Sequence, residues 1–529
     1  MTHRTRAAAI LKIRSRYDVC VDRPVTQNYL RPVDKDGQRL RNLTDEGMGM
    51  ERADIGSKMI APLRIWYFVC ALALCLGGAN LRAATPPHYV FAHYMVCLPS
   101  YGTTLDDFKQ EIQAAQAAGL DGFALNEGTW TNDYYSNYTA LIFQAAQELG
   151  TGFKLFFSID FGGGSNDTYS IGVVNAIVQQ YGHHPNYFQY QGKSVLSSYS
   201  THGLPWKDGI LTPLAQAGYP VFFVPYFEMT NWESWPNTSQ VAATYNLYSN
   251  VVDGMFYFGA SGLTTPLTNA NLAYVQASRA AGKLCMGSFS PSYWGIKQYS
   301  AKRRYYEADG GEGIEARWMA LINSQPDWVE ICTWNDMDEG TYVSPVASPS
   351  TANPYLGAPT RWSHNGYLEL SKHFISWYKN GQEPPLTQDA LYYFYRTHPL
   401  AAVPSDTNDV ICQWWEGTYD DSLYTTVYLT APAELDVVSG SGGSTNVLPA
   451  GRSHVRTPFL PGPQTMTIRR QGNVVLTVQG TPDIQAQIVN QDLLSTTGFA
   501  YASSNSTNNS PSSTNNLPAA PMNLRVVPQ

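Results

Sequence analysis

The sequence predicts a mixed α/β protein in which a (β/α)8 TIM-like barrel is followed by a C-terminal all-β sandwich. Three observations lead to this fold class. Strand-like and helix-like segments alternate from residue 88 onward, polar residues recur where the strand-like runs end, and short β-type runs replace this pattern after residue 385. We place the catalytic barrel at residues 88–384 and the sandwich at residues 385–498.

Apolar or alternating runs make up the predicted strands of the barrel. They lie at residues 89–96, 121–126, 153–161, 194–200, 220–228, 252–259, 283–291 and 328–336. Helical patterns separate them, as in residues 105–119, where apolar residues recur at spacings of three and four and Gly119 ends the pattern. A doubly wound sheet would alternate in the same way, but no Gly-rich phosphate loop follows the first run, which favours the barrel.

Polar side chains stand at or near the carboxyl ends of these runs. They are His93, Asn126, Asp160, Tyr226 with Glu228, Asp253, Ser290 and Asp336. In a TIM barrel the active site is built at this end of the strands. Any one of these residues could be a helix N-cap or a core residue, but their recurrence predicts one shared site.

The two ends of the chain differ in composition from the predicted domains. Residues 59–84 have the basic start and apolar stretch of a signal peptide, and the polar residues 1–58 before it read as a mis-called or disordered extension. An uncleaved membrane anchor is the alternative. Residues 499–518 form a low-complexity linker, and residues 519–529 read as the start of a truncated fibronectin type III-like module. We therefore expect a secreted, extracellular protein.

Composition limits the partners that the protein can have. Hydrophobic residues make up 43% and aromatic residues 13% of the chain, which suits a large core or an aromatic-lined sugar cleft. The net charge is −8 and no basic patch is present, so nucleic acid is not an expected partner. The cysteines beyond the signal peptide are widely spaced, which indicates neither a disulfide framework nor a metal site. We expect a monomer that needs no cofactor.

The segment ICTWNDMDEG brings Asp336, Asp338 and Glu339 together just after a buried run. Glycoside hydrolysis uses two carboxyl groups, one donating a proton and the other activating water or attacking carbon. The spacing of Asp336 and Glu339 can reach both the retaining and the inverting separation, so it leaves the stereochemistry open. A polar turn that caps the next segment is the competing interpretation. Asp338 is either an outward-facing turn residue or a third charge that tunes the pair.

Other side chains are candidates for binding sugar. Asp160 is a second carboxylate candidate, and the glycines that follow it allow a ligand to approach the backbone. Glu330 has the parity of the barrel interior, and we interpret it as a structural ion-pair partner. Trp334 shares strand parity with Asp336 and would stack on a sugar ring beside it. The residues predicted to bind substrate are His93, Asn126, Asp160, Tyr226, Trp294, Trp334 and Asn335.

The ordered set of blocks VFAHYMV, AAGLDGFALNEG, FKLFFSIDF, FVPYFE, SFSPSYW and VEICTWNDMDEG resembles glycoside hydrolase family 71, the α-1,3-glucanases or mutanases. The resemblance covers residues 88–400. It implies a TIM-like barrel with a C-terminal β-sandwich, inverting hydrolysis of α-1,3-glucan, and a catalytic acid pair at Asp336 and Glu339. Met337 and Asp338 stand where the family usually has Tyr-Gly, which bears on substrate preference and on the pKa values of the two acids.

The sequence thus predicts a secreted glycoside hydrolase that cleaves α-1,3-glucosidic linkages in a glucan polysaccharide. We hypothesise that Glu339 is the general acid and that Asp336 positions or deprotonates the attacking water. One alternative is an endo-α-mannosidase-like hydrolase of the family 99 type, whose acid pair has the same spacing. The other is a non-catalytic carbohydrate-binding protein on the same scaffold, which the altered residues 337–338 favour.

Overall fold

The computed structural model describes residues 88–503, apart from gaps at 129, 131–132, 162–166, 200–203, 231–233, 296–302, 347–349, 354–357, 408, 410–411 and 416–418. The predicted N-terminal extension, the signal peptide and the final module lie outside the described residues. The last strand runs to Tyr501, so it continues into the predicted linker, the rest of which from residue 504 is also outside them. In the described part of the chain, every helix is too short or too polar to span a bilayer.

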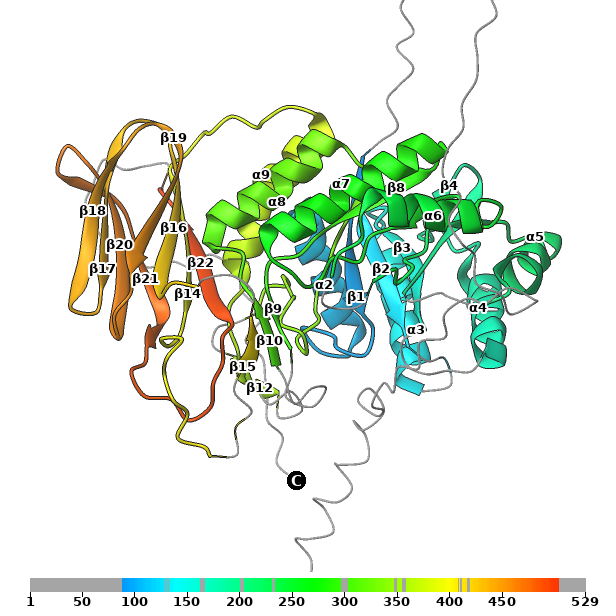
Figure 1. The fold of residues 1–529 in the computed structure, drawn as a ribbon, viewed down its shortest axis with the longest axis horizontal. Coiled ribbons are helices and arrows are strands. Elements are labelled where there is room, and N and C mark those ends of the chain that lie inside the picture. The colour runs from blue at the N-terminus through cyan, green and yellow to red at the C-terminus, as the bar shows by residue number, and fades with distance from the viewer. Residues whose placement is uncertain are drawn as a thin grey trace, which may run out of the picture. The chain divides into compact units, whose positions relative to one another are not determined.

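One nine-stranded sheet forms the centre of the N-terminal part (Figure 1). Its order is β4-β5-β3-β2-β1-β11-β8-β7, and β6 also pairs with β5. The strands are β1 (Tyr89–Met95), β2 (Gly122–Glu127), β3 (Lys154–Asp160), β4 (Gln189–Tyr190), β5 (Lys193–Tyr199), β6 (Val221–Phe223), β7 (Gly254–Phe256), β8 (Leu284–Phe289) and β11 (Trp328–Ile331). All pairings are parallel except the short β4–β5 hairpin, so successive strand-helix units stand in chain order around the sheet.

The sheet curls, because β1 pairs with the late strand β11 while the two remaining edges, β6 and β7, approach each other. The backbone N–H of Asp253 donates to the carbonyl of Phe223, and that of Phe256 donates to the carbonyl of Pro225, both at 2.9 Å. The Asp253 carboxylate also accepts the N–H of Phe223 at 2.9 Å. No ladder joins these edges in the described residues, but three hydrogen bonds do.

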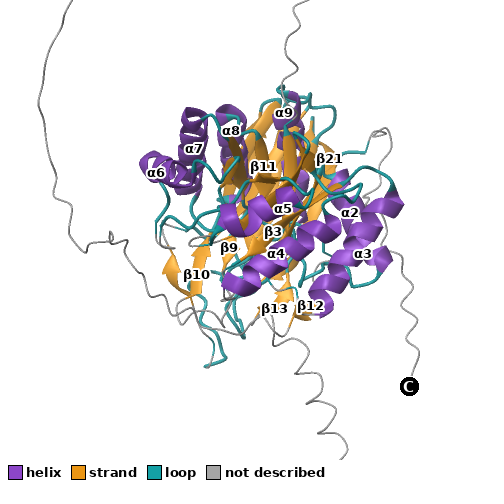
Figure 2. Ribbon diagram, turned by 90° about the vertical axis from the view of Figure 1, so that its right-hand side faces the viewer, coloured by secondary structure: helices purple, strands orange, loops and turns teal. Residues whose placement is uncertain are grey.

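Helices lie around the strands (Figure 2). They are α2 (Leu105–Ala117), α3 (Asp133–Leu149), α4 (Asp167–Tyr181), η1 (Trp206–Leu211), α5 (Thr212–Gln216), α6 (Thr238–Tyr248), α7 (Thr264–Ala281), α8 (Gly310–Ser324) and α9 (Asn365–Asn380). Local chemistry sets their ends: Thr104 and Asp107 form a capping box at the start of α2, and Gly282 ends α7 in the left-handed conformation. The apolar faces of these helices pack on the outer face of the sheet in one continuous core.

Two predictions about where side chains lie on the strands are wrong. Asp253 comes immediately before β7, so it lies at the amino end of the parallel strands and not at the carboxyl end. Asp253 is the second residue of the predicted run 252–259, and the pairing with β8 begins at Gly254, so the carboxylate precedes the strand. The last strand stops at Ile331, so the parity argument that linked Trp334 to Asp336 does not apply.

Small strand pairs lie beyond the main sheet. The strands β9 (Tyr293–Trp294), β10 (Arg303–Tyr306) and β15 (Cys412–Trp415) form one three-stranded sheet. A hairpin of β12 (Ser350–Asn353) and β13 (Ala358–Arg361) forms another unit. The sequence analysis did not predict either of them, because strands this short carry no periodic signal.

The C-terminal region contains two four-stranded antiparallel sheets, in yellow to red in Figure 1. The first has the order β19-β16-β14-β22 and the second β18-β17-β20-β21. Their strands are β14 (Ala390–Arg396), β16 (Ser422–Leu429), β17 (Ala433–Ser439), β18 (Gly442–Leu448), β19 (Gly451–Pro458), β20 (Gly462–Arg470), β21 (Asn473–Ile484) and β22 (Ser495–Tyr501). Leu391 and Val427 of the first sheet share a core with Leu435 and Ile468 of the second.

The first of these sheets packs on α8 and α9. A Cβ added at Gly311 of α8 would lie 2.1 Å from the Thr426 Oγ1 atom, and one added at Gly366 of α9 would lie 2.9 Å from the backbone of Gly498. His454 and Glu315 also meet across this contact at 3.0 Å. The helices therefore need glycine where they touch the sheet, since the backbones approach too closely for a side chain.

Candidate active site

The two acids of the ICTWNDMDEG segment lie on one turn beyond the carboxyl end of β11. Asp336 Oδ1 accepts the backbone N–H groups of Asp338 and Glu339, each at 3.0 Å. The N–H of Asp336 in turn donates to Thr333 Oγ1 at 2.8 Å. The carboxylate of Asp336 therefore builds the turn that carries Glu339. Asp336 thus has the turn-forming role of one interpretation, and it also stands beside the second acid, as the other interpretation requires.

Burial and neighbouring charges set the protonation of this pair. Burial raises the pKa of Asp336 well above its usual range, and the charges of Glu339 and Asp338 raise it further. Burial also raises the pKa of Glu339, but the positive charge of Arg304 and a hydrogen bond from Tyr293 act against that rise. In the free protein these environments favour the proton on Asp336 and the charge on Glu339, which is opposite to the roles that we hypothesised from the sequence.

Asp338 is the third charge and not an outward-facing turn residue. Its side chain is only 8% exposed. Its charge is among the causes of the raised pKa of Asp336. The departure of this chain from the usual Tyr-Gly thus adds a buried carboxyl group next to the acid pair.

Glu339 is held by the small sheet that contains β9 and β10. The Tyr293 hydroxyl donates to Glu339 Oε1 at 3.1 Å, and Arg304 Nη2 donates to the same hydroxyl oxygen at 3.0 Å. The guanidinium lies 5.0 Å from the centre of the Tyr293 ring. The N–H of Trp294 also donates to the Glu339 carbonyl at 2.8 Å. Sequence reasoning missed Tyr293 and Arg304, although the block SFSPSYW contains Tyr293.

A row of buried polar side chains crosses the inner face of the sheet. His93 Nδ1 lies 2.7 Å from Glu330 Oε1, and Asn126 Nδ2 lies 3.1 Å from His93 Nε2. Asn126 Nδ2 also donates to Asp160 Oδ2 at 3.4 Å. The structure therefore joins three of the predicted site residues, and it places Glu330 inside, within hydrogen-bond distance of His93. His93 and Asn126 use their polar atoms within the protein.

Asp160 stands at the mouth of the site, close to the second acid. It is partly exposed at the end of β3, and its charge raises the pKa of Glu339. Burial, and then the charges of Tyr226, Glu228, Glu339 and Asp160, raise the pKa of Tyr199 well above its usual range. These groups therefore share one electrostatic environment at the carboxyl ends of the strands.

Three partly exposed aromatic rings border this environment. The ring of Phe258 lies 5.0 Å from that of His93, 5.0 Å from that of Tyr199 and 6.1 Å from that of Tyr226. Tyr199 and Tyr226 lie 5.3 Å apart. Sequence reasoning found Tyr226 but missed Tyr199 and Phe258. The signal for Tyr199 was its place at the end of a predicted strand, as for the other site residues.

The remaining predicted site residues face the protein interior. The Asn335 side chain bonds the backbone of Met95 and the carbonyl of Leu98, and it is fully buried. Trp334 is 0% exposed and packs 5.3 Å from Phe123. Trp294 is also buried, in a cluster with Tyr305. Because all three side chains are enclosed by protein, a bound sugar would not reach them in the structure as it stands.

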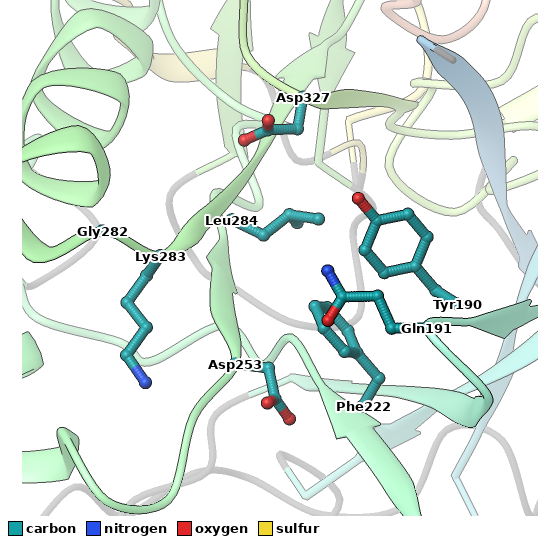
Figure 3. Close-up of a pocket in the computed structure, with 8 residues that line it drawn as sticks. All are labelled: Tyr190, Gln191, Phe222, Asp253, Gly282, Lys283, Leu284 and Asp327. Atoms are coloured by element: carbon teal, nitrogen blue, oxygen red, sulfur yellow. The ribbon is translucent and has the colours of Figure 1, made fainter. Parts of the chain in front are cut away.

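A pocket at the opposite, amino end of the strands is lined by eight residues (Figure 3). Asp253 accepts the Phe223 N–H there, and Asp327 Oδ2 accepts the Cys285 N–H at 2.9 Å. Asp253 precedes β7 and bonds the last residue of β6, and Asp327 precedes β11 and bonds Cys285 near the start of β8, so each aspartate joins two segments of the sheet. Among the described residues, no cluster of three or more His, Cys, Asp or Glu side chains is arranged to hold a metal ion.

The sequence of this chain is similar to those of known glycoside hydrolases. The sequence profile of glycosyl hydrolase family 71 matches residues 87–511. A glucan endo-1,3-alpha-glucosidase of Schizosaccharomyces pombe is 30% identical over 444 residues, covering 80% of this chain and 98% of the relative. A mutanase of Penicillium rubens is 28% identical over 418 residues, covering 78% of this chain and 88% of the relative.

Among solved structures, the family 99 endo-alpha-mannosidase of Bacteroides thetaiotaomicron aligns with a TM-score of 0.44 and 13% identity, over 55% of this chain and 98% of that one. The match of the family profile covers most of the chain, including the acid pair and the strands that surround it. The chain therefore belongs to glycosyl hydrolase family 71 and is a glycoside hydrolase.

Proposed function

We propose that this glycoside hydrolase cleaves α-1,3-glucosidic linkages in a glucan polysaccharide, with Asp336 and Glu339 as its catalytic acid pair. The names of the fungal relatives support the substrate. The observation that carries the chemistry is the single turn that holds both carboxyl groups, with Asp336 buried and Glu339 half-buried. Both pKa values are raised and the two groups interact, so they titrate as a pair in which one group holds a proton while the other is ionised, which an acid–base pair requires.

The proposed reaction is a hydrolysis with inversion. One carboxylic acid donates its proton to the glycosidic oxygen as the bond to the anomeric carbon breaks, and the other carboxylate removes a proton from the attacking water. The free protein favours the proton on Asp336 and the charge on Glu339. If this distribution persists in the complex, Asp336 is the acid and Glu339 is the base.

The sugar next to the scissile bond would meet a polar and an aromatic side. Asp160 is partly exposed and accepts hydrogen bonds, which suits a sugar hydroxyl. Tyr199, Tyr226 and Phe258 offer partly exposed rings on which the CH faces of a pyranose can stack. We propose that His93, Asn126 and Asn335 support this surface from below, because their polar atoms are used within the protein.

The same proposal includes the scaffold and the location of the enzyme. Strands in chain order, and the hydrogen bonds between β6 and β7, support a (β/α)8 barrel at residues 88–384. The shared core of the C-terminal sheets supports a sandwich at residues 385–498. We further propose a secreted monomer whose signal peptide spans residues 59–84. Amino-terminal sequencing of the protein from culture medium would test this, since a start before residue 84 contradicts removal of that segment.

The direct test is incubation of the purified protein with insoluble α-1,3-glucan, α-1,4-glucan and α-mannan. We expect release of reducing sugar from α-1,3-glucan alone, with the β-anomer appearing first by NMR because inversion changes the α-configuration. Release from α-mannan alone would favour the family 99 type of activity. Binding to glucan without release of sugar would show a carbohydrate-binding protein instead, and would contradict the proposal.

A further inference from the structure

The polar row on the inner face of the sheet consists of Glu330, His93, Asn126 and Asp160. It runs from the protein interior to the mouth of the site. Phe91 is paired with Glu330, and His93 follows two residues later on β1. His93 is paired with Ala124, and Asn126 follows two residues later on β2. Since side chains two residues apart on a strand share a face, each step keeps to the inner face and moves toward the carboxyl end.

The last step follows the same rule. Asn126 is paired with Ser158, and Asp160 follows two residues later on β3. The row therefore runs across four adjacent strands, from the fully buried Glu330 to the partly exposed Asp160. Neighbouring members are joined at 2.7, 3.1 and 3.4 Å.

The directions of the hydrogen bonds are coupled along the row. The amide nitrogen of Asn126 can only donate, and it faces both His93 Nε2 and Asp160 Oδ2. His93 Nε2 must then be the unprotonated nitrogen, so the Nδ1–H donates to the carboxylate of Glu330. A carboxylate at residue 330 therefore selects the tautomer of His93, which in turn selects the orientation of the Asn126 amide.

The burial of Glu330 and His93 indicates that the row does more than fill space in the core. Glu330 and His93 are 0% and 1% exposed, and two buried ionisable groups are expensive to desolvate. Apolar side chains of similar volume would fill the same space without that cost. Burial raises the pKa of Glu330, and the hydrogen bond from His93 opposes the rise.

We propose that Glu330 is a positioning residue that acts through His93 and Asn126 to orient Asp160 toward a hydroxyl of the bound sugar. The role of Asp160 in this statement rests on the proposed function. The hydrogen-bond directions do not rest on it, so they can be measured whether or not the substrate is a glucan. The charge of Asp160 also acts on Glu339 and on the uncharged hydroxyl of Tyr199, which lie outside the row.

The first test compares Glu330→Gln with the matched control Glu127→Gln in the full-length protein. Glu127 is a buried carboxyl group on β2 beside Asn126, but it bonds Thr139 of α3 on the outer face. Glutamine at residue 330 can donate as well as accept, so it no longer requires the Nδ1–H, and ¹⁵N NMR of labelled histidine should show the Nε2–H tautomer of His93 gaining population. The control should leave the Nδ1–H tautomer unchanged. An unchanged tautomer in Glu330→Gln overturns the proposal.

The second test is a double-mutant cycle with Asp160→Asn. We expect Glu330→Gln to lower kcat/KM by about tenfold on its own and to have almost no further effect in the Asp160→Asn background. Equal losses in both backgrounds would show that Glu330 does not act through Asp160. Glu127→Gln should change kcat/KM little in either background. If the wild-type protein does not hydrolyse the glucan, the proposed function is contradicted. The tautomer measurement needs no substrate, so it still tests the role of Glu330.

A second variant keeps the inference testable if Glu330→Gln does not fold. Asn126→Asp has the same shape but can only accept, so His93 must donate from Nε2 and Asp160 faces a like charge. Because Glu330 still accepts from Nδ1, we expect ¹⁵N NMR to show His93 protonated on both nitrogens, with at least the same loss of kcat/KM. A folded Asn126→Asp protein that retains the Nδ1–H tautomer and wild-type kcat/KM overturns the proposal.

Discussion

Asp336 Oδ1 accepts the backbone N–H of Glu339 at 3.0 Å, so one acid of the pair holds the chain that carries the other. A single turn therefore sets the backbone separation of the two acids. The sheet of β9 and β10 then fixes Glu339 from the other side through Tyr293. We therefore expect distinct effects on activity, pH profile and stability from three kinds of substitution. They lie in this turn, in the residues that hold it, and in the contact with the C-terminal sheets.

Glu339→Gln and Asp336→Asn should each lower hydrolysis of α-1,3-glucan by about 10²–10⁴-fold, because each removes one of the two proton-transfer groups. Both replacements keep the size of the side chain, and the amide oxygen introduced by Asp336→Asn can still accept the two N–H groups, so thermal unfolding should change little. Activity on α-glucosyl fluoride assigns the roles. The variant that retains this activity has lost the acid, because fluoride leaves without protonation. Wild-type activity on glucan in either variant would contradict the assignment of the pair.

Asp338→Asn should move the alkaline limb of the pH profile of kcat/KM to lower pH. The charge of Asp338 raises the pKa of Asp336, so removing that charge lowers this pKa. The pair then loses its remaining proton at a lower pH, and activity falls sooner as pH rises. The control is Glu148→Gln, on the exposed surface of α3, which should leave both limbs in place. A shift of the alkaline limb to higher pH would contradict the inward orientation of Asp338.

Tyr293→Phe and Arg304→Gln should move the acidic limb of the same profile to higher pH. The charge of Arg304 and the hydrogen bond from Tyr293 both lower the pKa of Glu339, so their loss raises it. Glu339 then takes up a proton at a higher pH, and the ionised member of the pair is lost sooner as pH falls. Arg304→Lys keeps the charge and should shift the limb less than Arg304→Gln. Identical shifts in these two Arg304 variants would exclude the electrostatic explanation.

Arg396→Met should destabilise the protein by about 3–5 kcal/mol, because it leaves Glu307 buried without its partner. Arg396 on β14 bonds Glu307 at 2.6 Å and Asp421 at 2.7 Å. Urea unfolding measures the loss, and adding Glu307→Leu should recover much of it. Arg456→Met, which breaks the exposed pair with Glu312, is the control and should cost only about 0–1 kcal/mol. Equal costs for the two arginines would show that the buried pair does not stabilise the fold.

Much of the arrangement of strands could be predicted from the sequence. The apolar runs mark the parallel strands because each is buried on both faces, and their order along the chain is their order in the sheet. Asp160, Asp336 and Glu339 could be found because a charged residue directly after such a run is costly without a function. The prediction for Asp253 was wrong, because this residue comes near the start of its run and not after it.

The partners of these residues required the tertiary structure. Tyr293 and Arg304 lie on strands of two and four residues, too short to give a periodic signal. The bond between His93 and Asn126 depends on the register between β1 and β2, which no local pattern encodes.

The sequence alone determined the alternation of strands and helices, the family resemblance and the acid pair on one turn, because these are carried by residues close together in the chain. Only the tertiary structure decided that Asp338 points inward, that the free protein favours the charge on Glu339, and that Glu330 connects to Asp160. Those properties depend on burial and on contacts between distant segments, and neither can be read from the order of residues.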